Sequence, residues 1–150
     1  MLYDSIADLY DGMRLLHYRS LFSRILEKDG SLSATEAFSV DAIYLLGEPT
    51  IKQFSDFLGI SQPNATYKIA NLAEKGYVEK IPSEEDRREF RLRVSDRFFG
   101  YYGNRTQPIA AAAQKLSESF SADELEIFEK ILNRLNQTLR QEDDSANGHL

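Results

Sequence analysis

The fold is determined by one segment, residues 50–95, which reads TIKQFSDFLGISQPNATYKIANLAEKGYVEKIPSEEDRREFRLRVS. Its first residues have the capping-box pattern of a helix start, with Thr50 as the cap. The short helix that follows is expected to end at Gly59 and to bury Ile51, Phe54, Phe57 and Leu58. Because Ser61 is a good N-cap, a second helix begins after a turn of about three residues. Two short helices joined by such a glycine-containing turn form a helix-turn-helix.

The second of these helices has an apolar stripe that predicts its orientation. Pro63 falls in the first turn, where a missing N–H costs little. Residues spaced at three and four positions form the inward stripe, which ends before Gly76 and consists of Ala65, Ile69, Leu72 and Ala73. After Gly76 the apolar period changes to two over residues 77–81 and 90–94, which is typical of strands. The polar, charged residues between these strands, 82–89, predict a hairpin wing.

Four more helices are expected, two before this segment and two after it. Apolar spacing predicts a long helix over residues 4–28 and another over about 34–46. The second starts with a capping-box pattern at Ser33 and is ended by Gly47 and Pro49. A helix of roughly 96–118 contains Gly100, Gly103 and Pro108, so a weak centre or kink is expected there. The last helix starts at residue 121, and the polar residues from 142 onward predict a disordered tail.

The predicted fold is therefore mainly α with a small β-hairpin wing, as one winged helix-turn-helix unit with additional terminal helices. The boundaries are a dimerisation helix at residues 1–30, a DNA-binding lobe at 31–95, dimerisation and connecting helices at 96–141, and the tail at 142–150. A chain of 150 residues has the length of one ordinary domain.

Over residues 4–141 the chain resembles the MarR family of bacterial transcriptional regulators. The resemblance rests on the helix of residues 50–59, on SQPNATYKI at 61–69 with LAEKGYV at 72–78, and above all on EDRR at 85–88 followed by RLRVS at 91–95. It implies a homodimer whose first and last helices form a dimerisation lobe, and a wing that reaches the minor groove. It also implies that a small anionic or aromatic effector can bind between the two lobes.

A recognition helix turns its apolar stripe inward and offers short polar or planar side chains to base edges in the major groove. On the face opposite the stripe, Asn64 suits adenine, and Tyr67 suits a thymine methyl group or a phosphate. Lys68 and Ser61 better suit backbone phosphates. The alternative is that Asn64 and Tyr67 are solvated helix surface. The candidate major-groove residues are Ser61, Gln62, Pro63, Asn64, Thr66, Tyr67 and Lys68.

The candidate wing residues are Asp86, Arg87 and Arg88. Arg88 is the choice for the minor groove, where a narrow A·T-rich stretch attracts a guanidinium. Asp86 is expected to orient a neighbouring guanidinium through a charge-assisted hydrogen bond. The competing interpretation is a solvated charged hairpin.

The net charge of −6 argues at first against nucleic acid as a partner. The distribution of charge favours it, because residues 87–93 contain four arginines and one acid, Glu89. Double-stranded DNA is therefore the expected partner. The main alternative is a winged-helix protein-interaction module without specific DNA binding, which the acidic pI and the acids Glu74 and Glu79 favour.

The terminal helices carry more apolar surface than one chain needs, so a homodimer is expected, on a pseudo-palindromic operator with half-sites about 10 base pairs apart or a multiple of that. The alternative is an ordinary intramolecular core. The candidate dimer-interface residues are Ile6, Leu9, Met13, Leu125, Phe128, Leu132, Leu135 and Leu139.

An effector site is expected where the family resemblance implies one, with an aromatic lining and one ionisable group. Such residues are more often simply core. The candidate effector-pocket residues are His17, Tyr18, Tyr44 and Tyr101.

Several classes of function are not expected. The chain has no cysteine and two histidines, so neither a thiol nucleophile nor a cysteine- or histidine-rich metal site is anticipated. No catalytic constellation or phosphate loop is evident, and the chain is interpreted as a non-enzyme without cofactor or metal. No apolar run approaches the roughly 20 residues of a membrane span and no secretory signal is evident, so a cytoplasmic location is expected. The regulator is most simply expected to be a repressor.

Overall fold

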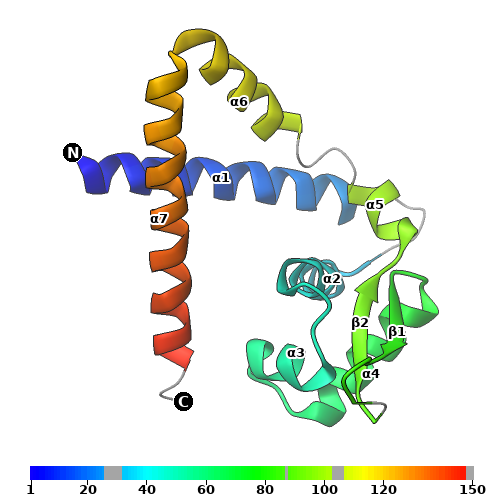
Figure 1. Cartoon of the computed structure of the whole chain (residues 1–150). Helices are drawn as coiled ribbons and strands as arrows, with labels where there is room; N and C mark the ends of the chain where they lie inside the picture. The colour runs from blue at the N-terminus through cyan, green and yellow to red at the C-terminus, as the bar shows by residue number, and fades with distance from the viewer. Residues whose placement is uncertain (26–31, 87, 103–106, 148–150) are drawn as a thin grey trace. The chain divides into compact units, whose positions relative to one another are not determined.

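The computed structural model describes residues 1–25, 32–86, 88–102 and 107–147 (Figure 1). It divides the chain into two compact units, Met1–Arg105 and Thr106–Leu150. The first unit contains α1 (Leu2–Ile25), α2 (Ala34–Leu46), α3 (Ile51–Leu58), α4 (Gln62–Glu74), β1 (Val78–Pro82), β2 (Phe90–Val94) and α5 (Asp96–Tyr102). The second contains α6 (Gln107–Ser119) and α7 (Ala122–Asn147).

The predicted helix caps form as the sequence indicates. Ser33 and Thr50 each complete a capping box, in which the hydroxyl and the side chain three residues later satisfy two backbone donors reciprocally. The Ser61 hydroxyl accepts from the backbone N–H of Asn64. Gly59 ends α3 at a φ of 64°, a left-handed conformation that glycine adopts without the strain of a Cβ. The turn between α3 and α4 is therefore fixed at both ends by local chemistry.

The wing is an antiparallel pair of strands, with Val78 opposite Val94 and Pro82 opposite Phe90. The strands are joined to the helices by the segment before α3: the backbone N–H of Leu92 donates to the carbonyl of Pro49 at 2.9 Å. A single β-bridge also pairs Thr50 with Arg91. The hairpin is thus attached by its second strand to the turn between α2 and α3.

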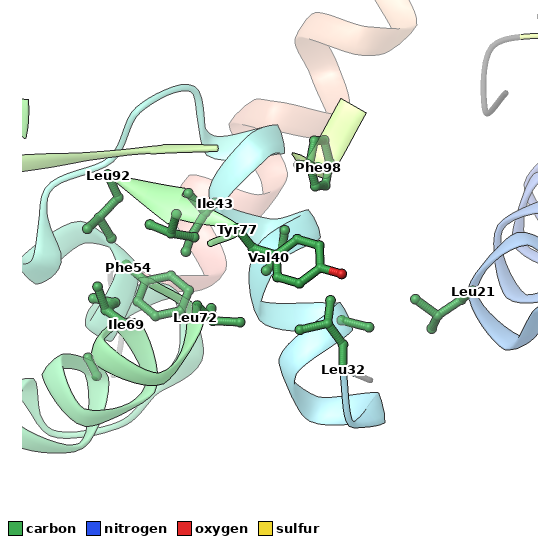
Figure 2. Packing of buried hydrophobic residues seen from close by; sticks show 13 residues of the cluster. Leu21, Leu32, Val40, Ile43, Phe54, Ile69, Leu72, Tyr77, Leu92 and Phe98 are labelled. Atoms are coloured by element: carbon green, nitrogen blue, oxygen red, sulfur yellow. The ribbon is translucent and has the colours of Figure 1, made fainter. Parts of the chain in front are cut away.

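A continuous hydrophobic core lies under the helix-turn-helix and the hairpin. Figure 2 shows Phe54 of α3, Ile69 and Leu72 of α4, and Leu92 of β2 close together in this core. All four are 0% exposed, and burial of such a side chain contributes roughly 1.5–3 kcal/mol. Leu21 of α1 also belongs to this cluster. The core therefore fixes which face of α4 points outward.

Two expectations from the sequence differ from the structure. Phe57 is 54% exposed rather than buried. At about 100° per residue it lies at the edge of the α3 stripe, and the buried Ser55 occupies the inner face instead. The expected helix over 96–118 is two helices, α5 and α6. The interval with Gly103 lies outside the described residues.

The expected disordered tail from residue 142 is wrong as far as Asn147, because α7 continues to that residue. No glycine or proline interrupts residues 122–147, and the first glycine after this stretch begins is Gly148. A polar composition alone therefore does not end this helix. The first helix, expected over 4–28, begins at Leu2, and its predicted end lies outside the described residues.

Candidate nucleic-acid interface

The outward face of α4 has the arrangement that a recognition helix requires. Ala65, Ile69 and Leu72 are fully buried. The candidate residues lie on the other side: Ser61, Gln62, Pro63, Asn64, Thr66 and Tyr67 are exposed, and Lys68 is partly buried. Tyr67 is 70% exposed. The core therefore leaves these polar groups free to meet another molecule.

A groove of about 310 Å³ lies between this face and the start of α2. Its α4 wall includes Asn64, Tyr67, Lys68 and Asn71, and its α2 wall includes Thr35. Hydroxyl, amide and ammonium groups of this kind suit contacts to phosphate and sugar oxygens. The contribution of Thr35 was not predicted from the sequence, because only the tertiary arrangement brings α2 beside α4.

The two walls of the groove are joined by an ion pair between Glu36 of α2 and Lys75 at the end of α4. The Lys75 ammonium lies 2.8 Å and 3.0 Å from the two carboxylate oxygens of Glu36. Burial raises the pKa of Glu36, but hydrogen bonds from Lys75 and Ser33 outweigh it, so the pKa is lowered overall. The ion pair of Glu36 thus joins the first turn of α2 to the end of α4 beside the groove.

The wing tip is a hydrogen-bonded turn rather than a loose loop. The backbone N–H of Ser83 donates to the carbonyl of Glu89 at 2.9 Å, and that of Glu89 donates to the carbonyl of Asp86 at 3.0 Å. The buried Ser83 hydroxyl accepts from the backbone N–H of Glu85 at 3.3 Å. These bonds present Arg88 at an exposed position of an ordered tip.

Asp86 bonds to the backbone of the wing tip. Its carboxylate accepts a hydrogen bond of 2.9 Å from the backbone N–H of Arg88. A short aspartate side chain readily reaches the backbone N–H two residues on, as in an Asx turn. The expected bond from Asp86 to a neighbouring guanidinium stays a prediction. Asp86 therefore orders the backbone that carries Arg88. Arg87 lies outside the described residues.

The arginines at the base of the wing are already paired with acids. The guanidinium of Arg93 donates to the Glu48 carboxylate at 2.5 Å, and that of Arg91 lies 3.5 Å from the Glu85 carboxylate. The hydrogen bond from Arg93 lowers the pKa of Glu48, and the bond to Glu48 raises the pKa of Arg93. The charge count over residues 87–93 therefore overstated the basic edge, since two of its four arginines have acidic partners.

The expected effector residues have partners within the first unit. Nδ1 of His17 lies 3.8 Å from a carboxylate oxygen of the buried Asp41. Tyr44 stacks on Phe98 and Phe99, with ring centroids 5.1 Å and 5.9 Å away. The rings of His17 and Tyr18 are 5.8 Å apart. The side chain of Tyr101 lies outside the described part of the chain, and a role for these residues in effector binding stays a prediction.

The expected dimer-interface residues retain solvent exposure within the single chain. On α1, Leu9 and Met13 are exposed and Ile6 is partly buried. On α7, Phe128 and Leu139 are exposed, and Leu125, Leu132 and Leu135 are partly buried. The α6–α7 unit also has a groove of about 330 Å³ lined almost entirely by apolar residues. Both units thus carry apolar surface that they do not bury themselves.

Clusters of metal ligands and membrane-spanning helices are two further features to consider. Across the described ranges, no three His, Cys, Asp or Glu residues gather as a metal site would require. Within those ranges, no helix combines the length and the apolar character needed to cross a membrane.

Comparison with known proteins identifies the segment that carries this site. Residues 32–90 match the model of the MarR family, from just before α2 to the start of β2. No match was found among curated proteins.

Solved structures share the fold at low sequence identity. FabT of Streptococcus pneumoniae, in complex with DNA, is 22% identical with a TM-score of 0.57, and the alignment covers 93% of this chain and 96% of FabT. A mutant of MepR from a multidrug-resistant clinical isolate of Staphylococcus aureus is 13% identical with a TM-score of 0.61, covering 93% and 97%. A mutant of MarR from Escherichia coli, complexed with operator DNA, is 19% identical with a TM-score of 0.50, covering 90% and 98%.

Proposed function

We propose that this chain, whose residues 32–90 match the MarR family model, is a DNA-binding transcriptional regulator that reads its operator with α4 and the wing. The observation that carries the proposal is the outward face of α4, where a continuous run of polar side chains lies opposite a fully buried apolar stripe. Amphipathic surface helices in general have a polar outward face, but here the face belongs to the second helix of a helix-turn-helix beside a wing. A helix that enters the major groove requires such a face.

The two parts of the site divide the work between the grooves. Asn64 suits a bidentate bond to adenine, and the exposed Tyr67 suits a thymine methyl group or a phosphate. Arg88, at the ordered tip of the hairpin, suits a narrow minor groove, whose potential attracts a guanidinium. Lys68 and the Ser61 hydroxyl supply backbone contacts that fix the register.

Two similar structures support DNA as the ligand. The FabT structure contains DNA, and the structure of the MarR mutant contains operator DNA. Their fold is the fold of this chain, and the same elements of this chain present the exposed polar groups described above.

We further propose that the regulator acts as a homodimer and most simply as a repressor in the cytoplasm. The apolar residues left exposed on α1 and α7 support this, because a second copy of the chain would bury them. A two-fold symmetric protein reads a pseudo-palindrome, with half-sites about 10 base pairs apart or a multiple of that.

A small aromatic or anionic effector that releases the DNA is the remaining element of the proposal. The partly exposed aromatic cluster of Tyr44 and Phe99 supports it.

The test of this function is a selection of binding sites from a random-sequence duplex pool, followed by titration of the best sequence at several salt concentrations. The proposal expects one enriched palindrome, bound with a steep salt dependence from counterion release. If no sequence is enriched and the protein also fails to bind a heparin column, the winged helix is a protein-interaction module instead.

A further inference from the structure

Glu48 lies in the turn between α2 and α3 and has an unusual backbone. Its φ is 57°, and among the described residues it is the one non-glycine residue with a positive φ. L-amino acids rarely adopt this left-handed conformation, which persists only where surrounding contacts impose it. The contacts made by Glu48 are therefore the feature to explain.

Glu48 binds both arginines at the base of the wing. Its backbone carbonyl accepts from the Nη1 of Arg91 at 3.2 Å, and its carboxylate accepts from the Nε of Arg93 at 2.5 Å. The backbone carbonyl of the next residue, Pro49, accepts a hydrogen bond of 2.9 Å from the backbone N–H of Leu92. Three successive residues of β2 are thus held by two residues of one turn.

The surroundings of the two arginines are acidic. They line a groove with Gly47, Ile81, Pro82 and three glutamates, Glu48, Glu84 and Glu85. A fourth acid, Glu79, lies directly opposite Arg93 in the sheet. Because carboxylates outnumber guanidiniums here, this part of the wing does not attract phosphate.

We propose that Glu48 is a specificity-determining residue: its carboxylate withholds Arg93 from the DNA backbone and leaves the wing tip as the part of the hairpin that contacts DNA. This inference rests on the proposed function. Arginine contacts to phosphate strengthen binding to every sequence alike, whereas base and groove contacts discriminate between sequences. A carboxylate that occupies Arg93 therefore limits sequence-independent binding and preserves the preference for the operator.

The pair is accessible enough for its loss to be measured. The side chains of Arg93 and Glu48 are 52% and 45% exposed, so a phosphate can reach Arg93 once the carboxylate is gone. Glu48→Gln removes the charge and keeps the length of the side chain. Glu48→Gly removes the side chain altogether and suits the positive φ, so that variant retains the turn.

The experiment measures the salt dependence of binding to the selected operator and to a scrambled duplex of equal length, using the full-length protein. Both Glu48 variants are expected to steepen the slope of log K against log salt by about 0.9, because each releases one arginine, Arg93. Their affinity for the scrambled duplex should rise more than that for the operator, so the ratio of the two affinities falls. Arg93→Gln alone should keep the wild-type slope, and adding it to Glu48→Gln should cancel the gain.

The matched control is Glu84→Gln, which removes the same charge from the same groove but leaves the bond between Glu48 and Arg93 intact. A slope for Glu48→Gln and Glu48→Gly equal to that of Glu84→Gln would overturn the inference. So would a shallower slope for Arg93→Gln alone, because Arg93 would then already contact phosphate. Either result leaves the proposed function standing, whereas a wild-type protein that binds neither duplex would overturn both.

Discussion

The backbone N–H of Arg88 donates a hydrogen bond of 2.9 Å to the carboxylate of Asp86, two residues before it at the tip of the wing. The bond ties the backbone of Arg88 to the Asp86 side chain, as in an Asx turn. An arginine on an ordered tip loses less conformational entropy on binding than one on a free loop. Asp86 thus acts on DNA through Arg88, although an acid itself repels phosphate.

Replacement of Asp86 separates this structural role from its charge. Asp86→Asn keeps an oxygen acceptor at the same position and should keep operator affinity at or slightly above wild type. Asp86→Ala loses the acceptor and should weaken operator binding, because the tip is no longer ordered. Fluorescence anisotropy at fixed salt measures both. If both variants bound the operator more tightly than wild type and equally well, only the negative charge of Asp86 would matter.

Asn64→Ala tests the major-groove contact. Asn64 is exposed, and its backbone N–H, which Ser61 caps, is unaffected by the substitution. Operator discrimination should therefore fall by about 1–3 kcal/mol while thermal stability stays unchanged. Competition titrations against operators altered one base pair at a time should show relaxed preference at one position in each half-site. Asn133→Ala, on an exposed position of α7, is the matched control, and an equal effect there would contradict the assignment.

Glu36→Gln tests the ion pair that joins α2 to α4. Burial raises the pKa of Glu36, but the hydrogen bonds from Lys75 and Ser33 lower it further, to below its ordinary value of 4.5. A lowered folded-state pKa means that the charge stabilises the fold above about that pH, and that this contribution disappears as the pH falls through the folded pKa. Since Lys75 is 39% exposed, solvent screening limits the loss to about 1 kcal/mol at neutral pH.

Urea unfolding of wild type and Glu36→Gln from pH 7 down to pH 3 measures this contribution. The difference in unfolding free energy should close as the pH falls. Glutamine can still complete the capping box, so the difference reports the charge. Glu126→Gln, on an exposed position of α7, controls for loss of any carboxylate. A gap between wild type and Glu36→Gln that is constant across the pH range would refute the assignment.

Leu135→Glu tests dimerisation through α7. Leu135 shares a helix face with Leu132, Phe128 and Leu139, and a charge placed there would have to be buried in a dimer. Sedimentation should show a dimer for wild type and a shift toward monomer for the variant. Gln137→Glu adds the same charge on the opposite face of α7 and should remain dimeric. A monomeric wild type at micromolar concentration would instead indicate that α7 serves an intramolecular core.

Much of the fold followed from local chemistry. The caps at Ser33, Thr50 and Ser61 and the change of period after Gly76 depend on residues within one turn or strand, so the sequence alone indicated where the elements begin and end. The face of α4 was predictable for the same reason, because Ala65 and Ile69 define its inner side.

Features that depend on distant residues were not predictable. Glu48 reaches Arg93 across 45 positions of sequence, and no sequence signal marks a glutamate for a left-handed backbone. The charge of the wing was therefore overestimated from residues 87–93 alone. Phe57 was misassigned for a local reason, because its apolar character was taken as a sign of burial although the helical phase puts it at the edge of the α3 stripe.

The measurement that tests the central claim most directly is an anisotropy titration of wild type, Arg88→Ala and Arg140→Ala against the selected operator at fixed salt. Arg140 lies exposed on α7 and controls for the loss of one positive charge. Wild type and Arg140→Ala should bind alike, and Arg88→Ala should bind about tenfold more weakly or worse, within the range of about 1–3 kcal/mol that one specific arginine contact contributes. Unchanged operator affinity in Arg88→Ala, with the fold intact, would contradict the claim that this wing reads DNA.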